Sequence, residues 1–520
     1  EDIDKILDTF KNEISLTTSD AGSSDASSQK SVLIVEHRML NPDNELRRIF
    51  GTRALMGDGA YRRRNQGVAH RGMWLSHPQA AWGRMSNVGV AMKQLETKDG
   101  CTYYKFEHNK EYQQVQFKFL DAVESSDHRN IATVLEKHNN HVDSMITFSD
   151  IYKIHDDVKM ARELIERSLF CLERSFHSCF NITTSNCRLE YKYQENRSLF
   201  LALYKHMNFV AQRGCNRTAL ELSKVLLSFD PIEDPLGVIF VIDNLSMRAG
   251  QYEFLIITLS TFPADRNLFL LPNWSYSTAL AQFELCNIGK CEKSKPDESL
   301  RRALIDFPTV LLLMLEKCSV QVDDEISKHP FFHSQATEST PQGLALLCHM
   351  FVERNYLLWK VPEVITWLLE NARGVLEGSG GSGGATDPAI SFTNFRRKSL
   401  YQKPPLNVYR HAMICELSGV SSLLPLEIRM GTMLSHDPLP PPSTVTSYTR
   451  PTRPTPPTRG SNPVSLFFNS LLPGFNPDEE HEGEVRGNIQ TLMNAMREML
   501  NGIQQPLDGS GEEEFAEDWD

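Results

Sequence analysis

"RGCNRTALELSKVLLSFDPIEDPL", residues 213–236, has the pattern of a turn followed by an apolar helix. Gly214 suits a turn, Ala219 is a small residue of the kind found where two helices cross, and Pro231 cannot continue the apolar run that precedes it. Upstream, Leu203 belongs to another apolar segment with helical spacing. The sequence therefore predicts two helices joined by a tight turn.

The same pattern of helix ends recurs along the chain. "LLSFDP" at 226–231, "TLSTFP" at 258–263 and "LIDFP" at 304–308 each end an apolar helix with an aromatic residue and a proline. Further residues at matching offsets are Tyr152, Ala161, Leu280, Phe283, Leu300, Ala303 and Pro308. One helical hairpin cannot bury its apolar face alone, whereas stacked hairpins share a continuous core. We predict an all-α fold, an irregular tetratricopeptide-like α-solenoid, and the alternative is an irregular all-helical domain.

The N-terminal part contains "SVLIVEHRMLNPDNELRRIFG", residues 31–51. Val32 to Val35 is a short apolar run that suits a buried strand. Asn41 and Pro42 then provide an N-cap and a proline at the first helical position, and the predicted helix ends at Gly51. We expect this strand-helix unit to cap the first hairpins, because an array must cover its terminal apolar surface. Contact with a partner is the alternative.

The C-terminal part is proline-rich and then amphipathic. "DPLPPPSTVTSYTRPTRPTPPTRG" at 437–460 predicts an extended segment, either a strap across the solenoid or a ligand for a groove. "NIQTLMNAMREMLNGI" at 488–503 predicts a helix with a broad, methionine-rich apolar face. That face could cover the chain itself or enter a partner's groove. The candidate partner-binding residues are Leu492, Met493, Met496 and Leu500.

Changes of composition divide the chain into segments. They predict an N-terminal helix and Ser/Asp linker (1–30), a capping region with the strand-helix unit (31–110), the helical-repeat solenoid (111–376), a Gly/Ser linker (377–388), a C-terminal helical segment (389–436), an extended strap with an apolar anchor (437–487), an amphipathic helix (488–504) and an acidic tail (505–520). The regular run "GSGGSGG" is typical of an engineered linker, and a natural linker is the alternative.

Composition and motifs favour a scaffold over an enzyme. The net charge of −12 repels phosphate, so we expect no direct DNA binding, and no apolar run is long enough to span a membrane. The sequence contains no Walker loop, no HExxH and no CxxC pair, so we expect no catalytic residue, cofactor or metal site. We interpret the ten cysteines as reduced core thiols, and His128, His138 and His141 as solvated polar residues. An enzyme with an unrecognised site is the alternative.

Several long segments carry a resemblance to a known family. "LIVEHRMLNPDNELRRIFG", "EHNKEYQQVQFKFLDAVES", "ENRSLFLALYKHM", "RGCNRTALELSKVLLSFDPIEDPL" and "DPLPPPSTVTSYTRP" resemble the transcription factor 25 family, also called nuclear localised protein 1, which includes ribosome quality control complex subunit 1. The similarity runs from about residue 31 to 503. This sequence departs from the family's pattern by lacking its basic N-terminal region and by carrying the Gly/Ser run where a natural loop is expected.

The resemblance implies a role in ribosome-associated quality control. It implies partnership with the RING-type E3 ligase Listerin, with ubiquitin, and with the large (60S) ribosomal subunit that carries a stalled nascent chain. The chain would then be a non-catalytic adaptor that favours the proteasome-directing ubiquitin linkage, in the cytosol and the nucleus. The family's older description implies an alternative, a transcriptional repressor or transcription-linked interaction protein.

Overall fold

The computed structural model describes the middle of the chain. The described residues are 32–51, 73–76, 78–79, 82, 88–125, 127–262, 268–290, 292, 294–322, 324–327, 329, 331–332, 340–378, 399–429 and 434–450. They belong to one unit that spans Glu1–Pro451. The predicted N-terminal helix, most of the Gly/Ser linker, the apolar anchor, the amphipathic helix at 488–504 and the acidic tail lie outside the described residues.

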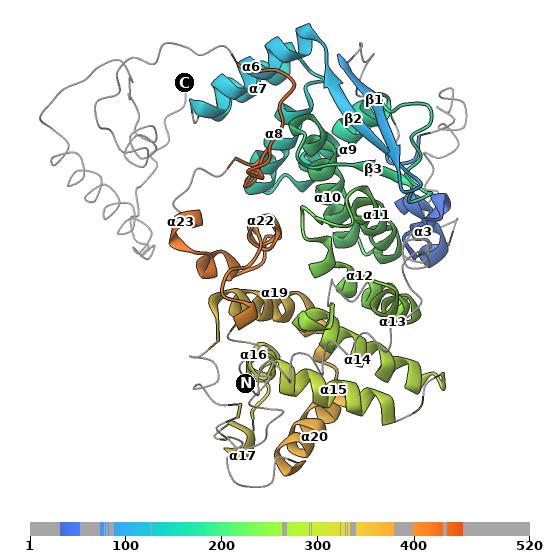
Figure 1. The fold of residues 1–520 in the computed structure, drawn as a ribbon, viewed down its shortest axis with the longest axis vertical. Helices are drawn as coiled ribbons and strands as arrows, with labels where there is room; N and C mark the ends of the chain where they lie inside the picture. Colours follow the sequence, from blue (N-terminus) through green and yellow to red (C-terminus); the bar gives the residue numbers. More distant parts are fainter. Residues whose placement is uncertain are drawn as a thin grey trace, which may run out of the picture. The chain divides into compact units, whose positions relative to one another are not determined.

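The described chain is mostly helical, and consecutive helices pack in pairs (Figure 1). The most extensive pairings join α8 (Val142–Ile154) with α9 (Val158–Glu173), α10 (Arg197–Gln212) with α11 (Asn216–Phe229), and α14 (Pro272–Asn287) with α15 (Ser294–Asp306). Gly214 makes the turn between α10 and α11 with a φ of +81°, which favours glycine. The predicted aromatic-proline ends are confirmed, because α11, α13 (Tyr252–Thr261) and α15 end there. The tetratricopeptide-like solenoid stays a prediction.

Most of the remaining helices pack around one main core or beside two smaller hydrophobic clusters. They are α6 (Lys110–Glu124), α7 (His128–Lys137), α12 (Ile242–Arg248), α16 (Thr309–Lys317), α17 (Asp324–Ser327), α19 (Gln342–Trp359), α20 (Pro362–Gly378), α22 (Leu406–Ile414) and α23 (Leu426–Arg429). The main hydrophobic cluster runs from Leu33 to Val375, and a second cluster joins Val408 of α22 to Leu346 and Met350 of α19. Across the described ranges, no helix is both long enough and apolar enough to cross a membrane.

The described chain also contains a small three-stranded sheet, so the predicted helical fold is confirmed in its main part and the sheet is an element that the all-α class left out. β1 (Val90–Lys98) and β2 (Cys101–His108) form an antiparallel hairpin, and β3 (Cys187–Leu189) pairs with β2 in parallel. The two-residue turn is Asp99-Gly100, whose φ angles are both positive at 52° and 65°. An Asp-Gly turn of this kind matches the twist of the flanking strands. The dipeptide was therefore a readable hairpin signal in a region predicted only as a cap.

The N-terminal segment contains the predicted helix but not the predicted strand. α3 (Pro42–Phe50) begins at Asn41, whose side chain accepts a hydrogen bond from the Asp43 amide, and it ends before Gly51. Val32 to Val35 forms no strand, and its pairing with the chain is one hydrogen bond from the Val35 amide to the Thr183 carbonyl at 3.1 Å. Leu33 and Val35 are buried in the main hydrophobic core. The run is therefore apolar because it packs against the helices, without pairing with another strand.

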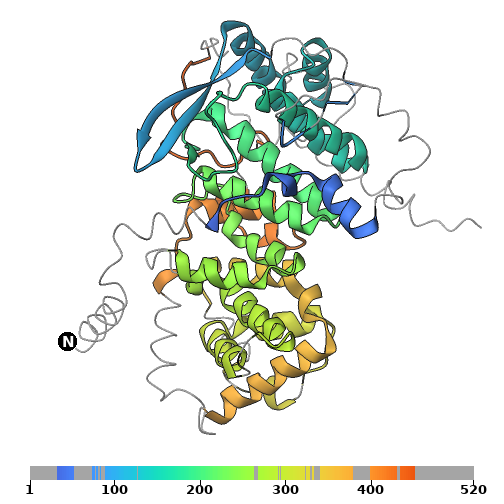
Figure 2. The same ribbon diagram turned by 90° about the vertical axis from the view of Figure 1, so that its right-hand side faces the viewer.

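The same segment packs against α11, in the middle of the order of helices, and does not cover the first helical hairpins. α3 and the short helix before it, His37–Leu40, contact α11, and Figure 2 shows this segment crossing in front of the central helices. Glu45 of α3 accepts hydrogen bonds from the amides of Arg217 and Thr218, in the first turn of α11. The expected capping position is therefore corrected: the segment attaches to α11.

Candidate functional site

The strap, which we define as residues 434–450, crosses the start of α10 and approaches α6 (Figure 1). The Val445 amide donates to the Lys192 carbonyl at 2.8 Å, and the Gln194 amide donates to the Val445 carbonyl at 3.3 Å. These two bonds form an isolated parallel bridge between Tyr193 and Val445. The strap thus pairs with the main chain of the segment that leads into α10.

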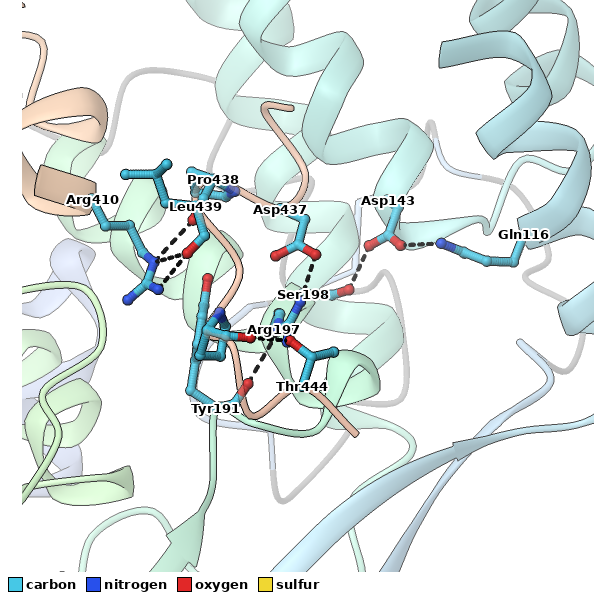
Figure 3. Close-up of polar contacts among 11 residues, drawn as sticks. Gln116, Asp143, Tyr191, Arg197, Ser198, Arg410, Asp437, Pro438, Leu439 and Thr444 are labelled. Carbon is cyan, nitrogen blue, oxygen red and sulfur yellow. Dashed lines mark hydrogen bonds and ion pairs between the residues drawn. The ribbon is translucent and has the colours of Figure 1, made fainter. Parts of the chain in front are cut away.

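Arg197, the first residue of α10, is the central anchor of the strap (Figure 3). Its guanidinium Nη1 lies 2.5 Å from a carboxylate oxygen of Asp437, and Nη2 donates to the Thr444 hydroxyl at 2.6 Å. Its Nε donates to the Tyr191 carbonyl at 3.1 Å. The Arg197 side chain is 2% exposed, so a buried charge is matched by one carboxylate and two polar oxygens.

Arg410 of α22 is the second anchor, and it binds the main chain of the strap. Its Nε donates to the carbonyls of Pro438 and Leu439 at 2.9 and 3.0 Å, and its Nη1 donates to the Pro235 carbonyl at 2.5 Å (Figure 3). The guanidinium carbon lies 4.8 Å from the centre of the Tyr191 ring, and that of Arg197 lies 5.3 Å from the same ring. Both arginines therefore contact the electron-rich ring as well as the strap.

A chain of buried polar groups extends from Ser198, the residue after Arg197, to α6. Asp143 accepts hydrogen bonds from the Ser198 hydroxyl at 2.5 Å and the Gln116 amide at 2.7 Å. The other end of the Gln116 amide contacts Nε2 of His141 at 2.8 Å, and Nδ1 of His141 contacts the Ser144 hydroxyl at 2.7 Å. The chain connects α6, α8 and α10 beneath the strap.

Burial and neighbouring groups set the charges in this region. Burial lowers the pKa of His141 to about 4, so its ring is neutral at pH 7. Burial raises the pKa of Asp437, and the nearby Arg197 opposes that shift. Burial acts to raise the pKa of Asp143 as well, but His436, His141 and the donated hydrogen bonds hold it below its ordinary value. His141 is 2% exposed, so its interpretation as a solvated residue is wrong.

The far end of the strap is held by more exposed contacts. The Tyr448 hydroxyl lies 2.6 Å from Nδ1 of His108, and the Ser447 amide donates to Glu195 at 3.1 Å. Arg450 forms ion pairs with Asp121 and Glu124 of α6. The side chains of Arg450 and Asp121 are 25% and 28% exposed and that of Glu124 is 65% exposed, so water weakens these ion pairs more than the buried pair of Arg197 and Asp437. The strap is therefore anchored most firmly at its Asp437 end.

These groups bind a peptide segment through its carboxylate and its main chain. Two guanidinium groups, one carbonyl and one amide contact a carboxylate and main-chain groups of the strap. Within the part of the chain that the structure describes, no three His, Cys, Asp or Glu side chains are placed to hold a metal ion. Burial raises the pKa of several thiols, including that of Cys171 to about 12, and the others are Cys187, Cys215, Cys318 and Cys415. A raised pKa keeps these thiols protonated and weakly nucleophilic.

Comparison of the sequence with known proteins shows the family of this chain. The family described as Transcriptional repressor TCF25 matches residues 104–441, a range that holds Arg197, Arg410 and Asp437. The chain belongs to the Tcf25 family. The "Ribosome quality control complex subunit TCF25" of Homo sapiens is 42% identical over 100% of this chain and 78% of the relative. The "Ribosome quality control complex subunit 1" of Schizosaccharomyces pombe is 25% identical over 79% of this chain and 58% of the relative.

A further relative carries a different description. The "Probable transcription factor claV" of Ampulloclitocybe clavipes is 29% identical over 78% of this chain and 56% of its own length. The Tcf25 family thus includes relatives with names from two areas of biology. Neither kind of name refers to the strap or to the two arginines that hold it in this chain.

The candidate partner-binding residues predicted from the sequence are not part of this site. Leu492, Met493, Met496 and Leu500 lie outside the described residues. Sequence reasoning missed Arg197 and Arg410, which stand in apolar helical stretches, "ENRSLFLALY" and "NVYRHAM". A charged residue on the buried face of a helix is a usable signal, because such a charge needs a partner. That signal does not indicate where in the chain the partner lies.

Proposed function

We propose that this chain is a non-catalytic adaptor of ribosome-associated quality control. It positions ubiquitin for the RING-type ligase Listerin and promotes linkage-specific, proteasome-directing ubiquitination of stalled nascent chains on the large ribosomal subunit, in the cytosol and the nucleus. The observation that carries the general role is the 42% identity, over the whole chain, to a relative named as a ribosome quality control complex subunit. The parts that concern Listerin and ubiquitin rest on the resemblance of the sequence segments.

Linkage selection by an adaptor needs geometry and no bond chemistry of its own. An acceptor ubiquitin held so that one lysine lies near the thioester of the conjugating enzyme reacts faster at that lysine, because its effective concentration is raised. A helical body with one continuous core, such as that formed here by α8 to α20, is suited to hold two proteins in a fixed relation. Binding of modest strength is sufficient for this effect.

The state of the cysteines supports a role without a covalent ubiquitin intermediate. A thioester-forming cysteine must be an accessible thiolate. Among the described residues, Cys179 is exposed, Cys286 and Cys415 are half-buried, and the buried thiols are Cys101, Cys171, Cys187, Cys215, Cys318 and Cys348. Cys179 has a backbone hydrogen bond from its amide to His177, but its sulfur contacts only Ser178, at 3.9 Å, among the hydrogen bonds of the described residues. The exposed thiol is therefore the one to test directly.

A reconstituted ubiquitination reaction tests the proposal. Listerin, its conjugating enzyme, ubiquitin and a stalled 60S–nascent chain complex are combined with and without the chain, using ubiquitins that each retain a single lysine. We expect the chain to increase transfer to one lysine above the others, and a reducing-agent-sensitive ubiquitin adduct on the chain to be absent. An unchanged linkage distribution would refute the adaptor role, and a thioester on the chain would make it an enzyme.

The alternative function is transcriptional repression. The family description as a transcriptional repressor and the relative named as a probable transcription factor favour it. The net charge of −12 opposes direct contact with DNA, so a repressor role would act through protein partners. A chain tethered to a promoter should then reduce reporter transcription while leaving the ubiquitination reaction unchanged, which is the opposite of the adaptor result.

A further inference from the structure

The strap adds few apolar side chains to the hydrophobic core, although its His436 ring packs on Phe119 and its Tyr448 ring packs on Phe117. His436, Asp437 and Pro438 are buried, whereas most positions from 440 to 450 are half-buried or exposed. No residue of 434–450 belongs to the hydrophobic clusters of the described chain. Segments with little buried apolar area open at a lower free energy than the whole domain unfolds. The strap is therefore a segment that can leave its position while the helices beneath stay folded.

Many of the contacts that hold the strap would fit other peptides. Arg410 binds the carbonyls of Pro438 and Leu439, and the chain at Lys192 and Gln194 exchanges two hydrogen bonds with the main chain of Val445. Other peptides carry the same carbonyl groups, and an amide at every residue except proline, and they can make these contacts when they adopt the same backbone, in which Leu439 has a φ of +46°. Main-chain hydrogen bonds of this kind give affinity without restricting the side chains of the bound segment.

Selectivity comes from the carboxylate at Asp437. The side chains of Arg197 and Asp437 are 2% and 11% exposed, so their ion pair is shielded from water. If the strap leaves, Arg197 loses its carboxylate partner. Arg410 then loses two of its three carbonyl partners. A buried charge that loses its partner is costly, so the surface left behind favours a new segment that carries a carboxylate at the same place.

The residues around Asp437 define the remaining features of such a segment. Pro438 follows the carboxylate and is buried, and three further prolines precede Thr444, whose hydroxyl accepts from Arg197. Each proline fixes a backbone angle before the segment binds, so proline-rich segments lose little conformational entropy on docking. We name the surface formed by Tyr191, Lys192–Gln194, Arg197 and Arg410 the strap groove.

We propose that the strap groove is a binding site for a proline-rich segment of a partner protein that carries an aspartate or glutamate before its first proline. The strap is then the internal occupant of the groove, and the partner segment displaces it. This proposal does not rest on the adaptor function. The groove adds a peptide-recognition activity to the chain.

A labelled peptide with the sequence of residues 434–450 is the probe. It is added to the full chain and to the full-length double variant Asp437→Lys/Val445→Pro, which removes the carboxylate and the amide that donates to Lys192. In the unaltered chain the tethered strap competes at high effective concentration. We expect the variant to bind the peptide at least about tenfold more tightly than the unaltered chain, measured by fluorescence anisotropy.

Two peptide variants establish which contacts carry the binding. A peptide with Asp437→Asn should bind the double variant about tenfold or more weakly, because Arg197 then lacks a carboxylate. A peptide with Ser443→Ala, at an exposed position, is the matched control and should bind like the native sequence. Equal binding of the Asn and native peptides would overturn the proposed selectivity.

Folding of the variant is followed by circular dichroism and thermal melting. Absence of peptide binding to a variant with the helical spectrum of the unaltered chain would overturn the proposal. If the double variant does not fold, Val445→Pro alone is compared with the unaltered chain by the same criterion. A dimer of the unaltered chain that dissociates when the peptide is added would make a second copy the occupant, and would overturn the assignment to a partner protein.

Discussion

Glu45 is predicted to fasten the N-terminal segment to the helical body. Its carboxylate, on α3 and 7% exposed, accepts the Arg217 amide at 2.9 Å and the Thr218 amide at 2.7 Å. These amides are in the first turn of α11, and the N-cap residue Cys215 provides no side-chain cap of its own. A serine or aspartate at the N-cap normally accepts these hydrogen bonds. Here Glu45 accepts them, although it lies 172 residues from Arg217 in the sequence.

The contacts give the magnitude of the effect. Glu45→Ala removes two hydrogen bonds to a charged acceptor and a negative charge at the N-terminus of α11. A hydrogen bond to a charged group contributes about 1.5–3 kcal/mol, and water replaces part of it when the segment detaches. We therefore expect Glu45→Ala to lower the free energy of unfolding by about 3 kcal/mol. Glu45→Gln keeps one acceptor oxygen without the charge, and we expect it to cost about half as much.

Urea unfolding followed by circular dichroism measures the stability, and hydrogen exchange measures the local attachment. The Val35 amide donates to the Thr183 carbonyl. In Glu45→Ala this amide should exchange faster with solvent, because the N-terminal segment that carries Val35 and position 45 opens more often. Arg48→Ala, at an exposed position on the same helix, is the matched control. If Glu45→Ala were as stable as Arg48→Ala, with Val35 equally protected, the inference that Glu45 fastens the segment would be refuted.

Substitutions of cysteine, histidine and methionine test other features of the molecule. Serine at each cysteine in turn, including the exposed Cys179, should leave linkage preference intact in the ligase reaction; its loss in a folded variant would indicate catalysis. Burial lowers the pKa of His141, so the melting temperature should fall as pH drops from about 6.5 to about 4, with up to about 3 kcal/mol lost at this residue; a flat profile would contradict this. His206→Leu removes two buried ring nitrogens without partners and should raise the free energy of unfolding by about 1 kcal/mol, whereas a decrease in the urea midpoint would show that the ring is needed. Met496→Asp should lower the melting temperature if the amphipathic helix covers the chain itself, or weaken ligase or ubiquitin binding if it docks on a partner; no change in either would refute both.

Local signals in the sequence predicted the elements that local chemistry determines. The Asn41 cap, the proline at position 42 and Gly51 placed α3 correctly, since each acts within one turn of the helix. The proline after Phe262 and the one after Phe307 likewise follow the ends of α13 and α15. The Asp99-Gly100 turn was equally local, and it could have predicted the β1–β2 hairpin.

The strap contacts could not be predicted in the same way. Arg197 and Asp437 are 240 residues apart, and no periodicity in the sequence relates them. A buried arginine indicates that a partner exists, but many acidic residues are available in a chain with 66 of them. The prediction of a strand at Val32 to Val35 was wrong for a related reason. Burial of a segment against distant helices produces the same apolar composition as a strand.

Three segments that lie on the described helices are attached by the same kind of contact. In each case a buried charged side chain of one segment binds the main chain of another: Glu45 accepts amides of α11, Glu173 of α9 accepts amides of residues 74–76, and Arg410 donates to carbonyls of the strap. Such contacts fix the register of an extended chain without requiring a large apolar side chain from it. Helices that already hold two of the chain's own segments in this manner are well suited to hold a segment of another protein, which is why the strap groove is the surface on which we expect a partner peptide.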